Sequence, residues 1–351
     1  MASDEEYMRL ALAAARKAGN ATWRNPRVGS CLVKDGKVLA TGFHQHYGGF
    51  HAERDTISKL TPEQLSNSTI YVTLEPCCHY GKQPPCTQLI IDSGIKRVVV
   101  GATDPHALVT GKGIAALRQA GLEVSTGLLA KEASQLNDHY NYFYQTGLPY
   151  VTLKQAMTLD HMLAKKGERT AITGAEAWTR VHQERAGYQA VLIGSETAII
   201  DDPLLLTSED LVHPPVRVVL DRRGRLLEHL DLRLFSDKRA KTWILTENSA
   251  FLEQDMPKQV KIFALPDGKI STSIKILADQ GVQSVYAEGG AHLQESLLAA
   301  GLVNDVISYV APCFLGRGTE AAVAAEALDL KDVQTEQVGD DVRIYGRIKD
   351  V

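Results

Sequence analysis

Several features that mark other classes of protein are missing from this sequence of 351 residues. No apolar run approaches the ~20 residues that cross a membrane, and the first residues lack the basic start and apolar core of a signal peptide. Basic side chains are not in excess, since 38 Lys and Arg stand against 42 Asp and Glu. A protein that neutralises many phosphates is normally basic. We therefore expect a cytoplasmic globular protein with neither a membrane nor a nucleic acid as partner.

Cysteine is also scarce. The chain has five cysteines, an odd number, and Cys77, Cys78 and Cys86 lie within ten residues of one another. A disulfide framework normally uses an even and more widely spread set, whereas closely spaced cysteines are typical of a metal site. The cysteine pattern therefore indicates a bound metal before any longer motif is considered.

The length suits two domains of ordinary size. The stretch 140–150 holds four tyrosines, one glycine and one proline, and it breaks the periodicity on either side. We therefore expect a first domain at 1–145, a junction at 146–149 and a second domain at 150–351.

Apolar periodicity and turn residues place the elements of each half. Ser3 with Glu6 forms a capping box before the first helix, and Asp35-Gly36 is a tight-turn dipeptide. In the first half the predicted helices are 4–18, 52–60, 86–93 and about 114–120, around strands at 28–34, 37–41, 69–74 and 97–102. In the second half the predicted strands are 151–156, 190–193, 216–220, 242–245, 284–287 and 306–310, with helices between several of them. This alternation predicts an α/β fold for both halves.

A metal-binding pattern lies at the ends of these first-half elements. His51 precedes a predicted helix, Cys77 follows a strand, and Cys86 opens another helix. One imidazole and two thiolates suit zinc, and three protein ligands leave the fourth position for a water whose pKa the metal lowers to about 7. Glu53, two residues after His51, is placed to carry protons from that water to a ring nitrogen and a departing amine. The pattern predicts a zinc-dependent hydrolytic deaminase site, with His51, Cys77 and Cys86 as ligands and Glu53 as proton shuttle.

Two alternatives remain for this cluster. A structural zinc site in a nucleotide-binding or regulatory module would use a fourth protein ligand, which Cys78 or His79 could supply. A transfer-RNA deaminase would have a basic face and two residues between its cysteines, whereas here eight residues separate Cys77 from Cys86.

The segment from Thr73 to Cys86 closely resembles the deaminase half of the bifunctional riboflavin-biosynthesis deaminase/reductase family. Further matching pieces are Asn25-Pro26 with Val28-Gly29, His51-Ala52-Glu53, Asp104-Pro105 and Gly111-Lys112-Gly113. The likeness covers nearly all of residues 4–145. It implies a cytidine-deaminase-like α/β/α sandwich that acts on a small phosphoribosyl pyrimidine, 2,5-diamino-6-(5-phosphoribosylamino)pyrimidin-4(3H)-one.

The resemblance also implies roles for single residues of the first half. The candidate contacts to the base and phosphate are Asn25, His44, Lys82 and Asp104. Two neighbouring positions depart from the family, which commonly has proline where this chain has Arg24 and asparagine where it has His106.

Residues 150–348 resemble the reductase half of the same family, a dihydrofolate-reductase-like α/β domain that uses NADPH to reduce the ribosyl group to ribityl. The matching pieces include Thr158-Leu159-Asp160, Gly194 with Thr197, Asp201-Asp202-Pro203 and Glu288-Gly289-Gly290. The resemblance places Lys154 beside the reacting ribose and implies that Arg185 and Glu288 hold the substrate. The implied contacts to NADPH are Ala156, Thr197, Asp201 and Gly290.

Several reductase positions depart from the family pattern. His161 replaces a glycine, Ala171 a tryptophan, and Ser208 an arginine whose planar fork of donors serine cannot reproduce. We hypothesise that Arg169, in the adjoining loop, compensates for Ser208. The alternative is a deaminase of the same substrate with an impaired reductase half that serves mainly as a scaffold. A homo-oligomer is left open as the assembly state.

Overall fold

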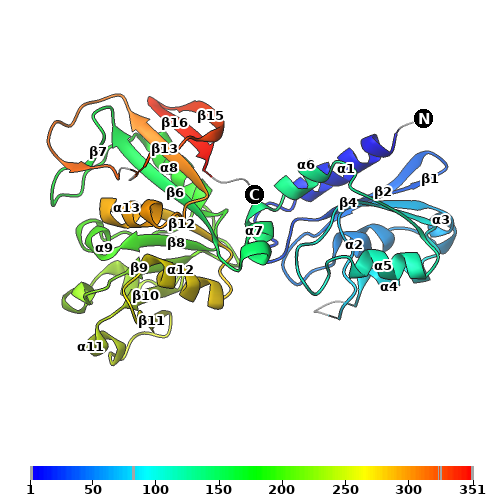
Figure 1. Ribbon diagram of the computed structural model, residues 1–351, viewed down its shortest axis with the longest axis horizontal. Helices are drawn as coiled ribbons and strands as arrows, with labels where there is room; N and C mark the ends of the chain where they lie inside the picture. The colour runs from blue at the N-terminus through cyan, green and yellow to red at the C-terminus, as the bar shows by residue number, and fades with distance from the viewer. Residues whose placement is uncertain (1–2, 81–83, 323, 325, 349–351) are drawn as a thin grey trace. The chain divides into compact units, whose positions relative to one another are not determined.

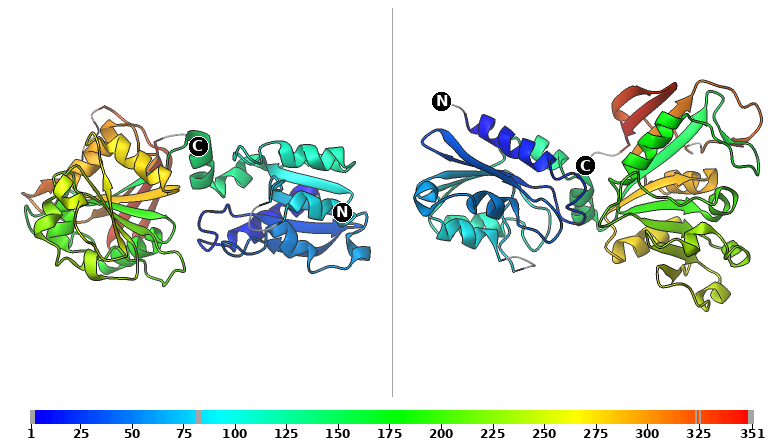
Figure 2. Two further views of the ribbon diagram at one scale, coloured as in Figure 1. Left: turned by 90° about the horizontal axis from the view of Figure 1, so that it is seen from below. Right: turned by 180° about the vertical axis from the view of Figure 1, so that it is seen from behind.

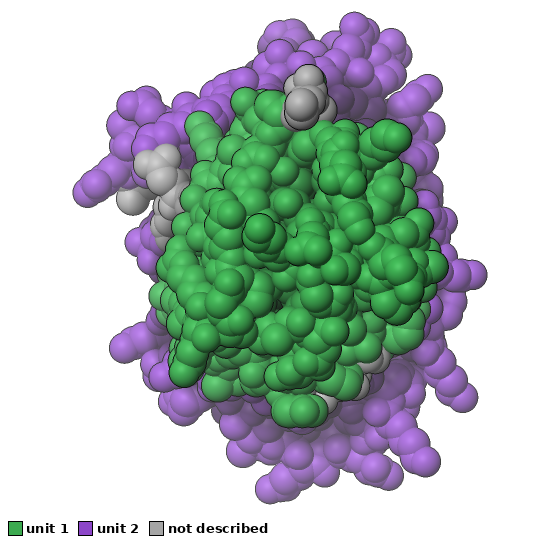
Figure 3. Space-filling model, turned by 90° about the vertical axis from the view of Figure 1, so that its right-hand side faces the viewer, with its two compact units in different colours: residues 1–147 green, residues 148–351 purple. Residues whose placement is uncertain are grey.

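The computed structural model describes residues 3–80, 84–322, 324 and 326–348. The chain divides into two compact units, residues 1–147 and 148–351, which Figure 3 shows in different colours. Within the described ranges, no helix is long and apolar enough to span a bilayer.

The first unit is a five-stranded sheet between two layers of helices (Figures 1 and 2). The strand order is β2-β1-β3-β4-β5; β1 is antiparallel to both of its neighbours, and β3, β4 and β5 are parallel. The strands are β1 (Gly29–Lys34), β2 (Lys37–Phe43), β3 (Thr69–Leu74), β4 (Arg97–Ala102) and β5 (Glu123–Thr126). The helices are α1 (Asp4–Arg16), α2 (Ala52–Ile57), α3 (Pro62–Leu65), α4 (Cys86–Asp92), α5 (Lys112–Gln119), α6 (Ala130–Gln135) and α7 (Asp138–Thr146).

Alternation along the strands explains the two helical layers. Tyr71 and Val99 point to one face, where they pack with α1 and α6, while their neighbours Ile70 and Val98 point to the other, where they pack with α2, α4 and α5. Both apolar sets are buried. The predicted α/β/α sandwich is confirmed.

Local signals in the sequence account for several element ends. The Glu6 amide donates to Ser3 Oγ at 3.3 Å and the Ser3 amide to Glu6 Oε2 at 2.6 Å, so the predicted capping box is present at α1. Asp35 and Gly36 have φ values of 51° and 73°, which is the backbone that a tight hairpin turn requires.

The second unit is built on a nine-stranded sheet with the order β11-β10-β9-β8-β12-β6-β13-β16-β15. Its strands are β6 (Tyr150–Thr158), β8 (Ala190–Gly194), β9 (Val216–Leu220), β10 (Thr242–Thr246), β11 (Val260–Ala264), β12 (Ser284–Gly289), β13 (Asp305–Ala311), β15 (Lys331–Val338) and β16 (Asp341–Arg347). The strands from β11 to β13 are parallel, and β16 and β15 add an antiparallel hairpin. A separate two-stranded sheet joins β7 (Met162–Ala164) to β14 (Thr319–Glu320).

Helices cover both faces of this larger sheet. On one face α12 (Ile270–Asp279) and α13 (Ala291–Ala299) pack on β6, β8 and β12. On the other face lie α8 (Ala175–Arg185), α9 (Ser195–Asp201), α10 (Arg233–Ser236) and α11 (Ser249–Leu252), beside the 3-10 helix Arg225–Glu228. The α/β class predicted for the second half is confirmed.

The stretch 140–150 was expected to break periodicity, but the structure differs. Helix α7 runs through Thr146 and buries Tyr140. The left-handed Gly147 (φ 74°) then ends the helix, and Tyr150 already begins β6. An aromatic-rich helix, rather than a loop, accounts for the unusual composition.

Candidate active sites

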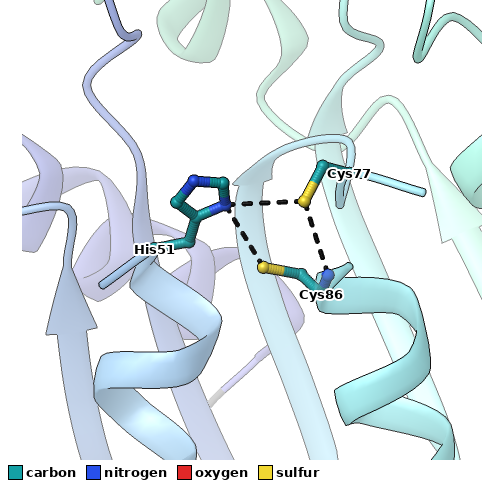
Figure 4. A group of neighbouring side chains, drawn as sticks. All are labelled: His51, Cys77 and Cys86. Atoms are coloured by element: carbon teal, nitrogen blue, oxygen red, sulfur yellow. Dashed lines mark hydrogen bonds between the residues drawn. The ribbon is translucent and has the colours of Figure 1, made fainter. Parts of the chain in front are cut away.

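Three metal-binding side chains meet where β3, α2 and α4 begin or end (Figure 4). The ligand atoms of His51, Cys77 and Cys86 all lie within 4.8 Å of one another. His51 Nδ1 is 3.5 Å from Cys77 Sγ and 3.4 Å from Cys86 Sγ. A tetrahedral ion with bonds of about 2.0–2.3 Å separates its ligands by about 3.5 Å. The three side chains therefore have the spacing and the chemistry to hold zinc.

The thiols of this group influence one another. Hydrogen bonding with Cys86, and then with His51, lowers the pKa of Cys77 to about 4. The same contact with Cys77, together with burial, raises the pKa of Cys86. Because the thiolate is the form that binds a metal, the cluster has one sulfur that ionises readily and a second that a cation would help to ionise.

Glu53 lies on the first turn of α2 and is only 3% exposed. Burial, the largest influence, raises the pKa of this carboxyl above its usual value. A carboxyl whose pKa moves toward neutrality can both take up and release a proton at working pH. Glu53 thus has the electrostatic setting of a proton carrier beside the cluster.

Two of the three cluster residues, His51 and Cys77, line a cavity of about 250 Å³ together with Glu53. Asn25, His44 and Asp104 line the same cavity, so the structure brings together most of the predicted site residues of the first unit. Lys82 lies outside the described residues. The full lining is Arg24, Asn25, Pro26, Val28, His44, Tyr47, Gly48, Gly49, His51, Glu53, Leu74, Glu75, Cys77, His79, Asp104, His106, Val109, Tyr140 and Tyr144.

His44 and Asn25 form a pair within this lining. His44 Nδ1 lies 2.8 Å from the Phe50 carbonyl oxygen, which can only accept, so Nδ1 carries the proton. The other nitrogen, Nε2, then accepts from the Asn25 side-chain amide at 3.0 Å. Burial also lowers the pKa of His44, which keeps the ring neutral. Both ring nitrogens of His44 are therefore hydrogen-bonded, and the bond at Nε2 fixes the orientation of the Asn25 amide.

Asp104 is held by residues that the motif did not reveal. Its carboxylate accepts from the His106 amide at 2.8 Å and from the Tyr140 hydroxyl at 3.1 Å. Burial is the main reason that the pKa of Asp104 rises to about 6. The Tyr144 ring packs 4.2 Å from His106, so α7 contributes two tyrosines to the cavity.

Glu75 organises the loop that carries Asp104. Its carboxylate accepts from the amides of Gly111, Gly113 and Ile114 at 3.0–3.1 Å, at the start of α5. A Cβ at Gly113 would lie 2.1 Å from the Pro76 carbonyl oxygen, so only glycine fits. The segments Glu75-Pro76-Cys77 and Gly111-Lys112-Gly113 therefore pack against each other.

A second group of charged side chains lies on the α8 face of the larger sheet. Leu153 on β6 is paired in register with Ala287 on β12. The next residue on each strand, Lys154 on β6 and Glu288 on β12, is therefore a neighbour of the other. Arg185, at the end of α8, donates to both carboxylate oxygens of Glu288, with Nη2 at 2.8 Å from Oε2. The structure thus brings these three predicted residues together.

Charge and burial set the protonation of this group. Burial lowers the pKa of Lys154, although the nearby Glu288 opposes the shift. Burial would raise the pKa of Glu288, but the charge and hydrogen bonds of Arg185 outweigh it and hold that pKa below its usual value. A carboxylate and an amine whose pKa is lowered by burial therefore lie side by side.

His182 is a member of this group that the motifs did not reveal. Its Nε2 lies 3.2 Å from Arg185 Nη1, which also donates to the Leu206 carbonyl oxygen at 2.9 Å. Its other face packs on Trp178, with ring centroids 3.9 Å apart. Spacings of four and three residues along α8, which put side chains on one helical face, are the signal that could have pointed to it.

Two of the predicted NADPH contacts are joined by a hydrogen bond. Thr197 Oγ1 accepts from the Gly290 amide at 3.0 Å, where α13 begins. Ala156 lies two residues after Lys154 on β6 and so shares its face of the sheet. Asp201 is the last residue of α9. Burial raises the pKa of its carboxyl, and the positive charge of the exposed Arg169 opposes that shift.

Known proteins resemble this chain over nearly its whole length. Residues 149–344 match the family described as RibD C-terminal domain, and residues 1–102 match the cytidine and deoxycytidylate deaminase zinc-binding region. The riboflavin biosynthesis protein RibD of Actinobacillus pleuropneumoniae is 38% identical over 97% of this chain and 94% of its own. That of Bacillus amyloliquefaciens is 39% identical over 99% of this chain and 97% of its own.

Solved structures agree with these relatives. Acinetobacter baumannii RibD (form 1) superposes with a TM-score of 0.88 at 34% identity, covering 99% of both chains. A diaminohydroxyphosphoribosylaminopyrimidine deaminase/5-amino-6-(5-phosphoribosylamino)uracil reductase from Thermotoga maritima superposes with a TM-score of 0.87 at 34% identity, covering 98% of both chains. Nothing in these likenesses or in the described residues favours an impaired reductase. The chain belongs to the RibD family of bifunctional riboflavin biosynthesis enzymes, with a zinc-binding deaminase domain followed by a reductase domain.

Proposed function

We propose that the first unit deaminates 2,5-diamino-6-(5-phosphoribosylamino)pyrimidin-4(3H)-one and that the second reduces the ribosyl group of the product to ribityl with NADPH. The observation that carries the proposal is the grouping of His51, Cys77 and Cys86 as metal ligands at a cavity that His51, Cys77 and Glu53 line. Since substrate and cofactor are soluble small molecules, we place the reaction in the cytoplasm.

In the deaminase site, His51, Cys77 and Cys86 would hold zinc, which when bound supplies the positive charge that activates water. Glu53 takes a proton from that water and delivers it to the ring nitrogen; it then moves the second proton, from the added hydroxyl, to the leaving amine. One water is consumed, the carbon–nitrogen bond to the 2-amino group breaks, and ammonia leaves as a carbonyl forms.

Recognition of the pyrimidine falls to neighbouring residues. The Asn25 amide, oriented by His44, offers a donor and an acceptor to the base edge. Asp104, held by Tyr140 and the His106 amide, presents its carboxyl to the same cavity. Lys82 stays a proposed phosphate contact.

In the reductase site, NADPH supplies the hydride. Lys154 is proposed to lie beside the reacting ribose carbon, while Arg185 and Glu288 hold the substrate through a charge pair that is already formed. Ala156, Thr197, Asp201 and Gly290 are the proposed cofactor contacts; the start of α13 offers amides to a cofactor phosphate. Arg169 remains our candidate to replace the arginine missing at Ser208.

A two-step assay tests both halves. Ammonia release from the diaminopyrimidinone and NADPH oxidation with the deaminated product are followed separately on the full chain. Glu53→Gln is expected to keep its zinc, abolish ammonia release and leave NADPH oxidation unchanged. Glu63→Gln, an exposed glutamate on α3, is the matched control. Ammonia release at the wild-type rate by Glu53→Gln would overturn the role of Glu53. Failure of the wild-type chain to release ammonia would overturn the deaminase assignment, and its failure to oxidise NADPH would overturn the reductase assignment.

A further inference from the structure

Positive charge is rare in the deaminase cavity. Among the described residues that line it, Arg24 is the one lysine or arginine, whereas Glu53, Glu75 and Asp104 contribute carboxyl groups. A phosphate monoester is bound best by a cation with several directed donors, and the guanidinium fork matches it. A phosphorylated ligand in this cavity would therefore meet Arg24 as its cationic partner among these residues.

The acidic side chains of the cavity have other partners. Glu75 accepts from three backbone amides at the start of α5. Asp104 accepts from Tyr140 and from the His106 amide. These donors offset part of the negative charge of both carboxyl groups, which limits their repulsion of a ligand phosphate.

The loop before β1 holds Arg24 in place. Its guanidinium carbon lies 4.5 Å from the centroid of the Trp23 ring, and the Tyr47 ring meets Trp23 edge-on at 4.8 Å. Trp23 has a φ of 52°, a left-handed backbone that is uncommon for a bulky residue. Such strain persists only where the surroundings impose it, and it gathers at functional sites. Backbone hydrogen bonds from Asn25 to Thr22 and from Tyr47 to Ala21 fasten the same loop.

The position of Arg24 in the sequence also suits a contact to the phosphate. Arg24 directly precedes Asn25, whose amide is oriented by His44 toward base recognition. In a ribosyl phosphate the anionic group is covalently joined to the base, so neighbouring residues can bind the two ends of one ligand.

We propose that Arg24 binds the phosphate group of the deaminase substrate and makes this site selective for the phosphorylated form. The inference rests on the proposed function, and it assigns to this chain a phosphate contact of its own. Arg24 is a binding residue; the proton transfers stay with Glu53.

Ammonia release measured with the phosphorylated substrate and with its dephosphorylated counterpart tests the proposal. Arg24→Ala should raise the KM for the phosphorylated substrate about 10- to 100-fold, as expected for the loss of hydrogen bonds to a charged group, and leave the KM for the dephosphorylated one within about twofold. Arg24→Lys should restore part of the loss, because it keeps the charge without the fork. Arg16→Ala, at an exposed arginine of α1, is the control and should change neither KM. An equal loss on both substrates, or no loss on either, overturns the proposal.

A local binding measurement separates this inference from the proposed function. Hydrogen–deuterium exchange of residues 20–28 is followed in the zinc-loaded full chain with ribose 5-phosphate as the probe. Protection in the wild type that is absent in Arg24→Ala supports the phosphate contact, whether or not ammonia is released. Lack of protection in the wild type, or equal protection in both proteins, overturns it. Absence of ammonia release from either substrate would instead refute the deaminase assignment.

Discussion

Arg185 Nη2 donates to Glu288 Oε2 across 2.8 Å, and Nε donates to the other oxygen of the same carboxylate. The two side chains are only 9% and 10% exposed. Removing one partner of a buried pair leaves an uncompensated charge and costs about 3–5 kcal/mol. Because Lys154 lies beside them, this pair sets the charge of the proposed reductase site.

Glu288→Gln should therefore impair the second reaction alone. The amide keeps the shape of the side chain but removes the negative charge that opposes the lowering of the Lys154 pKa. We expect the kcat/KM for NADPH oxidation to fall by about 100-fold, or nearly 3 kcal/mol, with ammonia release unchanged. Steady-state kinetics with the deaminated product measure the loss. Glu295→Gln, at an exposed site on α13, serves as the control; equal activity of the two variants would contradict the assignment.

His182 should act through Arg185. Burial, followed by the charge of Arg185, lowers the pKa of His182 to about 4, so the ring is a neutral acceptor for the guanidinium at neutral pH. His182→Ala is expected to lower the kcat/KM for NADPH oxidation about tenfold, whereas His182→Gln, whose amide oxygen can accept, should keep most of it. Because His182 stays neutral above its pKa of about 4, the pH profiles of kcat/KM for the wild type and for His182→Gln should have the same shape between pH 5.5 and 8. A glutamine variant as impaired as the alanine variant would rule out this positioning role.

The metal cluster was predictable because its residues lie at the ends of strongly patterned elements. β3 and β4 are buried apolar runs whose bounds equal those predicted, and His51, Cys77 and Cys86 lie at the ends of such elements. Parallel strands and following helices bring such ends together. The local sequence pattern was therefore sufficient to predict the three metal ligands.

Contacts between distant segments were not predictable in the same way. Tyr140 reaches Asp104 from α7, a helix whose aromatic composition resembled a junction. The strands β15 and β16 were missed because neither buries a row of apolar side chains. Nearly every residue of β15 is exposed, and the buried residues of β16 are Asp341 and Gly346. Glu75 binds amides more than 30 residues away in the sequence, and a single sequence holds no signal for such pairing.

Stability of the second unit should depend on the protonation of Asp305, which opens β13. This side chain is buried, with its Oδ2 3.0 Å from the Tyr150 hydroxyl, and burial raises its pKa to about 6. The folded chain therefore keeps a proton that the unfolded chain, with a pKa near 4, releases. The stabilisation is fully present below about pH 4 and is lost as the pH rises through 6, a change of about 3 kcal/mol.

Asp305→Asn isolates this effect, because the amide is neutral at every pH. The stability of the variant relative to wild type should increase by about 2–3 kcal/mol between pH 4 and pH 7. Calorimetric unfolding of the full chain at several pH values measures the difference, with Asp279→Asn, an exposed aspartate of α12, as the control. A pH-independent difference would show that Asp305 is ionised in the folded state throughout this range.

Metal content distinguishes a three-ligand site from a structural four-ligand site. Cys78 directs its thiol to the Leu108 carbonyl oxygen at 3.7 Å, away from the group formed by His51, Cys77 and Cys86. Cys77→Ser should lose most of its zinc and its ammonia release, whereas Cys78→Ser should keep one zinc per chain and near-normal activity. Removing zinc with a chelator should abolish ammonia release, spare NADPH oxidation with the deaminated product, and be reversed by added zinc. Loss of zinc from Cys78→Ser would mean that the fourth position is occupied by protein rather than open to water, and the cluster would then hold the fold together instead of performing hydrolysis.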